Sequence, residues 1–360
     1  MHKFFIIFSL IIMIFIAKFY FFKPLNSEKN KKEYHHLEQP IKRYYSNEMR
    51  YHFNINGISA QIPYATNMDI SKDHKKVTKL ILSIHSSSYN PDIYLDNSLA
   101  LFKKNRTLNQ KILIISPAFF RKDKTKLLNI VKWSVSPFWG SSRGIFKSKK
   151  IELSSYEVLD DILTHIITSK NFPNLSSIVI LGHSAGGQLV NRYASCNTIE
   201  DNIALEHEIS MKYLVMAPSS YVYFDGRRAK NDNNLAFYFP FGVNKKYNFW
   251  GYGVEHLYSY HKRHNITADD IRFQYKYRKV LYLVGENDTT DRALDKSRSA
   301  MFEGKNRKER LQIYYNYLQA YYGKEITDYQ TMSIIPNVGH WGKALMLSDE
   351  GKRFILSDIE

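Results

Sequence analysis

The sequence predicts an α/β fold in which a mostly parallel, doubly wound sheet follows an initial β-hairpin. Three observations lead to this prediction: Asn56-Gly57 separates two strand-like segments, short apolar runs recur along the chain, and helical patterns lie between these runs. The hairpin strands are expected at 51–55 and 58–62. The apolar runs lie at 79–84, 111–116, 177–181, 212–217, 279–284 and 331–335. The clearest helical pattern spans 155–169.

Composition sets the broad class of the protein. The chain has 360 residues, of which 44% are hydrophobic, so it is long enough for one large domain with a sizeable core. Its formal net charge is +17, but the lysines are scattered and form no basic helix, so we expect a cationic, solvated surface and no nucleic-acid partner. Cys196 is the single cysteine, which excludes an intrachain disulfide. No histidine, cysteine and carboxylate cluster has metal-ligand spacing, so we expect no metal and no cofactor.

The N-terminal segment predicts attachment to a membrane. Residues 4–22 are almost entirely apolar and long enough to cross a lipid bilayer, and the segment lacks a good cleavage site. We therefore expect a signal anchor at 1–25, a polar tether at 26–49 and a folded domain at 50–360. Lysines after the segment favour a cytoplasmic location for the chain that follows it. A short N-terminal tail usually stays in the cytoplasm, which favours the opposite orientation. We expect the domain on the periplasmic or extracytoplasmic side, and a secreted protein if the segment is cleaved.

The stretch 219–277 interrupts the alternation of strands and helices. It is rich in Tyr, Phe, Asn and Gly and lies between the apolar runs 212–217 and 279–284. We expect it to form a lid-like insertion.

The chain is organised around residues 177–188, where an apolar strand leads into Gly-His-Ser-Ala-Gly and then into a helix. The pattern G-x-S-x-G in this context predicts a sharp turn with Ser184 exposed at its apex. Gly182 and Gly186 remove side chains that would collide where strand and helix approach each other. The amide of Ala185, at the start of the helix, is expected to face an oxyanion formed at Ser184.

A serine nucleophile needs a base, and the base needs an acid that orients it. In this architecture the acid and then the histidine follow the serine along the chain. Asp288 follows the apolar run 279–284 and is the expected acid, with Asp291 or Glu286 as alternatives. His340 lies in a Gly-containing loop after the last run and is the expected base.

With these residues in place, the sequence resembles the α/β-hydrolase superfamily from about residue 50 to its end, and more narrowly a poorly characterised group of predicted serine hydrolases. The resemblance rests on several short motifs. These are Ser116-Pro117, Trp139-Gly140, residues 154–160, residues 172–175, the Ser184 turn, residues 217–221, residues 285–288 and residues 338–340. It implies the α/β-hydrolase fold and a triad of Ser184, Asp288 and His340, but no particular substrate.

A second oxyanion donor is expected from the loop after residues 79–84, which contains Ser86 and Ser87 where hydrolases usually carry glycine. Either serine is expected to donate a backbone amide or a hydroxyl. His85 is expected to brace this loop, and His183 to pack beside the nucleophile.

These residues predict a serine hydrolase that cleaves a small carboxylic ester through an acyl-enzyme. The aromatic insertion favours an apolar acyl or aryl group. Two alternatives stay open at this point: a peptidase or amidase of the same fold, and an inactive, membrane-tethered binding scaffold.

Overall fold

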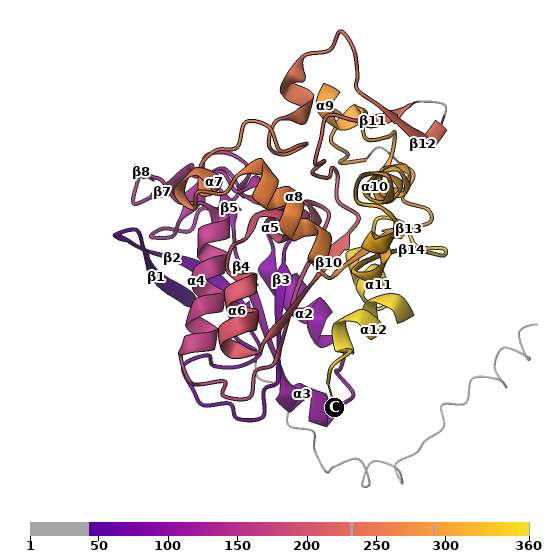
Figure 1. The fold of residues 1–360 in the computed structure, drawn as a ribbon. Coiled ribbons are helices and arrows are strands. Elements are labelled where there is room, and N and C mark those ends of the chain that lie inside the picture. Colours follow the sequence, from indigo (N-terminus) through magenta and orange to yellow (C-terminus); the bar gives the residue numbers. More distant parts are fainter. Residues whose placement is uncertain (1–42, 231–232, 291, 360) are drawn as a thin grey trace, which may run out of the picture. The chain divides into compact units, whose positions relative to one another are not determined.

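The computed structural model describes residues 43–230, 233–290 and 292–359 (Figure 1). The expected anchor at 1–25 and most of the expected tether at 26–49 lie outside these residues. None of the helices described is both long and apolar enough to span a membrane.

Within the described chain, eight strands form one sheet in the order β1-β2-β4-β3-β9-β10-β13-β14. Neighbouring strands from β4 to β14 run parallel, whereas β2 is antiparallel to both β1 and β4. Their bounds are β1 Arg50–Ile55, β2 Ile58–Thr66, β3 Lys79–Ile84, β4 Ile112–Pro117, β9 Ser177–His183, β10 Ser210–Met216, β13 Val280–Gly285 and β14 Gln330–Ile335. The predicted hairpin and the six predicted apolar strands are thus confirmed, with ends shifted by a few residues at most.

Helices lie on both faces of this sheet (Figure 1). The helices described are α2 Pro91–Leu99, α3 Arg106–Lys111, α4 Ser155–Thr168, α5 Ala185–Cys196, α6 Glu200–His207, α7 Tyr260–Arg263, α8 Ala268–Tyr277, α9 Arg298–Met301, α10 Arg307–Tyr322, α11 Gly342–Met346 and α12 Asp349–Leu356. Short 3₁₀ turns are η1 Pro137–Trp139, η2 Lys245–Asn248 and η3 Lys324–Asp328. The predicted helix at 155–169 is α4, which begins with a capping box between Ser154 and Glu157.

Two small sheets lie outside the main sheet. One joins β5 Phe120–Arg121, β6 Lys132–Trp133, β7 Gly144–Phe146 and β8 Lys149–Ile151, and the other pairs β11 Arg228–Lys230 with β12 Asn233–Tyr238. The first sheet was not predicted, because strands of two or three residues carry no readable alternation.

The expected insertion at 219–277 does separate β10 from β13, and it contains β11, β12, η2 and α7. Its last part is α8, which packs against α5 and bonds β13 and β14 through Tyr275. The region that departs from the regular alternation therefore ends before Ala268.

The folded unit includes residues that the sequence assigned to the tether. Tyr44 pairs with Thr66 at the end of β2, and Ser46 donates backbone and side-chain hydrogen bonds to Asp92, at 2.8 and 3.1 Å. These contacts fasten the chain to β2 and to α2 before the predicted domain start at residue 50.

The core lies on both sides of the central strands. Every residue of β3, β4, β9 and β13 is buried, as expected for parallel strands that helices cover on both faces. Because β3, β9, β10, β13 and β14 run in one direction, their carboxyl ends meet at one edge of the sheet. The side chains that follow these ends are therefore brought together.

Candidate active site

Ser184 occupies the turn between β9 and α5 with backbone angles φ 57° and ψ −116°. A positive φ is unfavourable for a residue with a side chain, so the surrounding structure must hold it in place. The Ser184 amide donates to the Met216 carbonyl at 2.9 Å, and this bond ties the turn to the end of β10. As N-cap of α5, Ser184 makes no capping bond through its hydroxyl.

The two glycines of the turn are required by close backbone contacts. A Cβ at Gly182 would overlap the carbonyl of Gly186, and a Cβ at Gly186 would overlap the carbonyl oxygens of Ile84 and His85. The predicted reason for these glycines is thus confirmed. The second contact also shows that the loop after β3 lies directly against the start of α5.

Asp288 and His340 come together after β13 and β14. His340 Nδ1 lies 2.7 Å from Asp288 Oδ2, within hydrogen-bond distance, and the Asp288 side chain is fully buried. The His340 side chain keeps 26% of its surface exposed. A carboxylate that accepts from Nδ1 fixes the imidazole with its Nε2 free to accept a proton.

His183 connects this pair to the serine turn. Its ring centroid lies 4.4 Å from that of His340, and the side chain packs so closely on Gly342 that a Cβ there would overlap it. Burial, followed by electrostatic interaction with His340 and Arg307, lowers the pKa of His183 well below its usual value. His183 is therefore a neutral, packed residue. Because it directly precedes Ser184, its contact with His340 brings the serine turn and the histidine loop together.

The loop after β3 carries Ser86 and Ser87, and His85 braces it. Buried His85 accepts the Phe119 amide at Nε2 (2.9 Å), so its proton is on Nδ1, which donates to the Ser86 carbonyl at 2.8 Å. Burial lowers the pKa of His85 to about 4, which keeps the ring neutral. The C=O and N–H bonds of a trans peptide point in opposite directions. Because the Ser86 carbonyl points towards His85, the Ser87 N–H of the same peptide points away from His85.

The hydroxyl of Ser86 is already engaged. It donates to Ser88 Oγ at 3.0 Å and accepts the Ser88 amide at 3.2 Å. The Ser86 hydroxyl is therefore a poorer oxyanion donor than a backbone amide of this loop.

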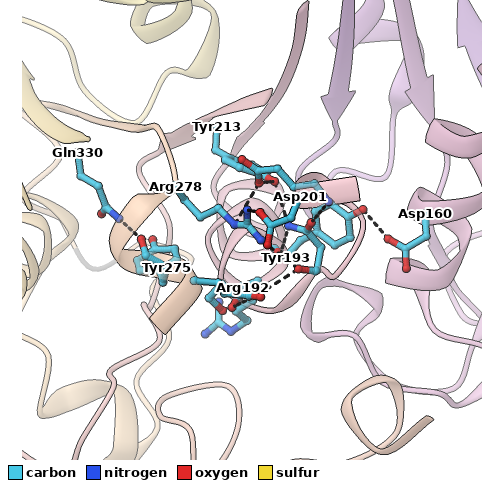
Figure 2. A network of polar contacts seen from close by, with 12 residues as sticks. Asp160, Arg192, Tyr193, Asp201, Tyr213, Tyr275, Arg278 and Gln330 are labelled. Carbon is cyan, nitrogen blue, oxygen red and sulfur yellow. Dashed lines mark hydrogen bonds and ion pairs between the residues drawn. The ribbon is translucent and has the colours of Figure 1, made fainter. Parts of the chain in front are cut away.

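Helix α5, which begins directly after Ser184, is held by buried polar contacts (Figure 2). Tyr193 donates to Asp160 at 2.6 Å, and Asn191 donates to the Tyr275 hydroxyl at 2.8 Å. Gln330 of β14 in turn donates to the Tyr275 carbonyl at 2.7 Å. All residues of α5 are buried, so the helix that carries the serine is anchored on several sides.

The alternative acids lie elsewhere. Glu286 is exposed and accepts the Asn337 amide at 3.1 Å, so it holds the histidine loop and does not contact His340. Asp291 lies outside the described residues. In the part of the chain that the structure describes, no group of histidines, cysteines and carboxylates is arranged to hold a metal ion.

Sequence reasoning missed one charged residue at this site. Arg307, the first residue of α10, is fully buried, and its Nη1 lies 3.6 Å from Asp288 Oδ1. The sequence around it, Arg-Lys-Glu-Arg, is typical of an exposed helix start and carries no signal of burial.

Comparison of the sequence with protein-family models and with curated proteins gave no match. The structure, in contrast, is similar to solved structures. A poly(3-hydroxybutyrate) depolymerase, LpqC, from Bordetella parapertussis superposes with a TM-score of 0.56 at 16% identity, over 85% of this chain and 89% of that one. Poly(aspartic acid) hydrolase-1 from Sphingomonas sp. KT-1 gives a TM-score of 0.55 at 14% identity, over 85% and 98%. The chain therefore has the α/β-hydrolase fold, as the sequence predicted.

Proposed function

We propose that the protein is a serine hydrolase that cleaves a carboxylic ester through an acyl-enzyme. The observation that carries this proposal is the 2.7 Å contact of His340 with buried Asp288, next to a serine held at positive φ on the adjoining turn. Two proteins with the same fold are named a depolymerase and a hydrolase, which agrees with hydrolytic chemistry.

In this mechanism, His340 Nε2 takes the proton of Ser184 as the serine oxygen attacks the ester carbonyl. The amide of Ala185 stabilises the oxyanion. The amide of Ser87 is the second donor, because its N–H points away from His85. His340 then protonates the departing alcohol. In the second half, His340 takes a proton from water as the water attacks the acyl-enzyme. His340 then returns a proton to the serine oxygen, which releases the acid and free Ser184.

The surface beside the histidine favours an ester with an apolar group. Trp341 follows His340 directly and is 63% exposed, which offers an aromatic face next to the proposed reacting atoms. We expect esters with acyl chains of some length to react faster than acetate esters.

Labelling with a fluorophosphonate probe tests the covalent mechanism. We expect the wild-type protein to be labelled at Ser184, and Ser184→Ala to lose labelling. Ser195→Ala is the matched control, because Ser195 is a buried serine of the same helix that bonds the Arg192 carbonyl. Equal labelling of the wild type and Ser184→Ala would contradict the proposal. Absence of labelling and of hydrolysis in folded protein would favour the binding scaffold.

A panel of p-nitrophenyl esters of graded acyl length, with matching anilides, then defines the substrate. We expect esters to be cleaved and anilides to be cleaved far more slowly, because an amine is a poorer leaving group than a phenol. Faster cleavage of anilides or peptides would assign the site to an amidase or peptidase.

We also propose that residues 4–22 anchor the protein to a bilayer, with the domain on the extracytoplasmic side. The proposal rests on their apolar composition alone, since they lie outside the described residues. Carbonate extraction of membranes, together with protease accessibility of intact cells, tests both parts. Full release of the protein by carbonate would contradict the anchor.

A further inference from the structure

Asp288 has two partners, one at each oxygen of its carboxylate. One carboxylate oxygen, Oδ2, contacts His340, and the other, Oδ1, lies 3.6 Å from Arg307 Nη1. The side chains of Asp288 and Arg307 are both fully buried. Among the described residues, Oδ1 has no hydrogen-bond partner, so the guanidinium acts on it as a nearby charge.

Arg307 is held in this position by backbone groups. Its Nη1 and Nη2 donate to the carbonyls of Arg292 and Ala293 at 3.1 and 2.6 Å. The next residue of α10, Lys308, donates its amide to the Asp288 carbonyl at 3.3 Å. The start of α10 therefore holds both the loop after β13 and the charge that faces the acid.

The other titratable and charged groups near the acid come from several elements. His183 of β9 reaches it through His340 and is neutral. Tyr221, after β10, interacts electrostatically with Asp288, and burial raises its pKa well above the usual value, so it is neutral as well. Arg310 lies one turn further along α10, where its guanidinium bonds the carbonyls of Gly304, Ser219 and Asp295. Among the described residues, Arg307 is thus the arginine that forms an ion pair with Asp288, at the carboxylate oxygen that does not contact His340.

We propose that Arg307 is a positioning residue that sets the pH at which His340 becomes a base, acting through Asp288. This inference rests on the proposed function. A guanidinium is protonated at every pH at which the enzyme folds, so it offsets part of the carboxylate charge that favours imidazolium. The imidazole then loses its proton at a lower pH than beside an uncompensated carboxylate, and the range in which Ser184 is activated extends towards acid.

The test is the pH dependence of the second-order rate of fluorophosphonate labelling at Ser184. Arg307→Gln removes the charge, and its acidic midpoint is expected to move upward by about half to one pH unit, because the carboxylate charge that favours imidazolium is then no longer offset. Arg307→Lys keeps a cation only while the buried ammonium stays protonated, so its midpoint is expected between those of the wild type and Arg307→Gln. Arg307→Met, whose unbranched stem fills the same space, is a second neutral variant in case Arg307→Gln does not fold.

Arg278→Gln is the matched control. Arg278 is a buried arginine in ion pairs with Glu200 and Asp201, and it precedes β13, whereas Asp288 follows it. This variant loses a buried charge without changing the field at the triad, so its midpoint is expected to equal that of the wild type. Circular dichroism over the same pH range reports the folded fraction of each variant.

Each result has a distinct meaning. Unchanged midpoints in the folded neutral variants overturn the inference. A wild-type midpoint in Arg307→Met beside a shifted one in Arg307→Gln also overturns it, because both variants lack the charge and hydrogen bonding by Gln would then be responsible. A wild-type protein that is not labelled at Ser184 refutes the proposed function and not the role of Arg307 in particular.

Discussion

The two ends of the central parallel strands carry polar residues of different kinds. At the amino ends, Lys79 of β3 donates to Ser177 Oγ and the Ser357 carbonyl, both at 2.7 Å, and Lys212 of β10 forms an ion pair with Asp358 at 2.7 Å. At the carboxyl ends, Ser184 has a positive φ and makes no capping bond. The amino ends thus use lysine hydrogen bonds and an ion pair to fasten the C-terminal segment to the sheet, and the carboxyl ends keep reactive groups available.

Unmatched polar atoms are buried beside the acid and the serine turn at the carboxyl ends. His183 Nε2 and Asp288 Oδ1 are buried at the carboxyl ends without a hydrogen-bond partner among the described residues. Such atoms cost folding free energy and are typical of functional sites. The comparison therefore predicts that substitutions at the carboxyl ends reduce reactivity, whereas those at the amino ends reduce stability and leave reactivity unchanged.

His340→Ala is expected to give the largest effect on reactivity. Removal of the general base should lower the rate of Ser184 labelling by at least about 10³-fold, with little change in melting temperature because the histidine is part-exposed. Exposed His207, in the last turn of α6, provides the control His207→Ala, which should label at the wild-type rate. A labelling rate in His340→Ala within tenfold of the wild type would contradict the view that the carboxyl ends carry the general base.

Gly186→Ala should reduce both stability and reactivity. The added Cβ would overlap the carbonyls of Ile84 and His85, so the turn must move away from β3. We expect the free energy of unfolding in urea to fall by about 2–4 kcal/mol and labelling of Ser184 to be largely lost. The control is Gly339→Ala, because a Cβ at Gly339 meets nothing within 4 Å. Equal stability of the two variants would show that the turn tolerates the displacement.

Local patterns explain how much of this arrangement was predictable. The strands, the Ser184 turn, and the acid and histidine after β13 and β14 each have a signature within a few neighbouring residues. The contact between Asp288 and His340 then follows from the parallel order of the strands. Their catalytic roles stay predictions until Ser184 labelling is measured.

The parts that could not be predicted depend on distant contacts. Arg307 reaches Asp288 because α10 folds back over the end of β13, and nothing in its own segment indicates burial. The packing of His183 against His340 joins residues 157 positions apart, and the small sheet of β5 to β8 consists of strands too short to recognise. The domain start was placed too late because the bridge of Tyr44 to Thr66 involves a single residue pair.

Arg278→Gln tests the amino ends of the strands. Arg278 is 3% exposed and pairs with Glu200 and Asp201 at 3.1 and 2.8 Å. Loss of one partner of a buried ion pair should lower the free energy of unfolding by about 3 kcal/mol and leave Ser184 labelling unchanged where the protein is folded. Exposed Arg353, replaced by Gln, is the control and should unfold like the wild type. A labelling defect in folded Arg278→Gln would show that the two ends are coupled.

The pH dependence of stability at Lys79 gives the smallest expected effect. Burial, and then the neighbouring charge of Lys212, lowers the pKa of Lys79 to about 7 from its usual 10.5, although Asp358 opposes the shift. Between these values the unfolded chain binds a proton that the folded chain does not. The stability contributed by Lys79 is therefore fully present above pH 10.5 and is lost as the pH falls through about 7.

Lys79→Met removes this proton linkage. The melting temperature of the wild type, relative to that of Lys79→Met, is expected to rise by about 2–5 °C from pH 7 to pH 9.5. Lys104→Met, at an exposed lysine, should follow the wild type at each pH. Labelling of Ser184 in folded Lys79→Met should match the wild type, because Lys79 begins β3 at the end opposite the serine. Parallel curves for the wild type and Lys79→Met would show that Lys79 stays charged in the folded protein. The lysines at the amino ends would then act as ordinary ion pairs.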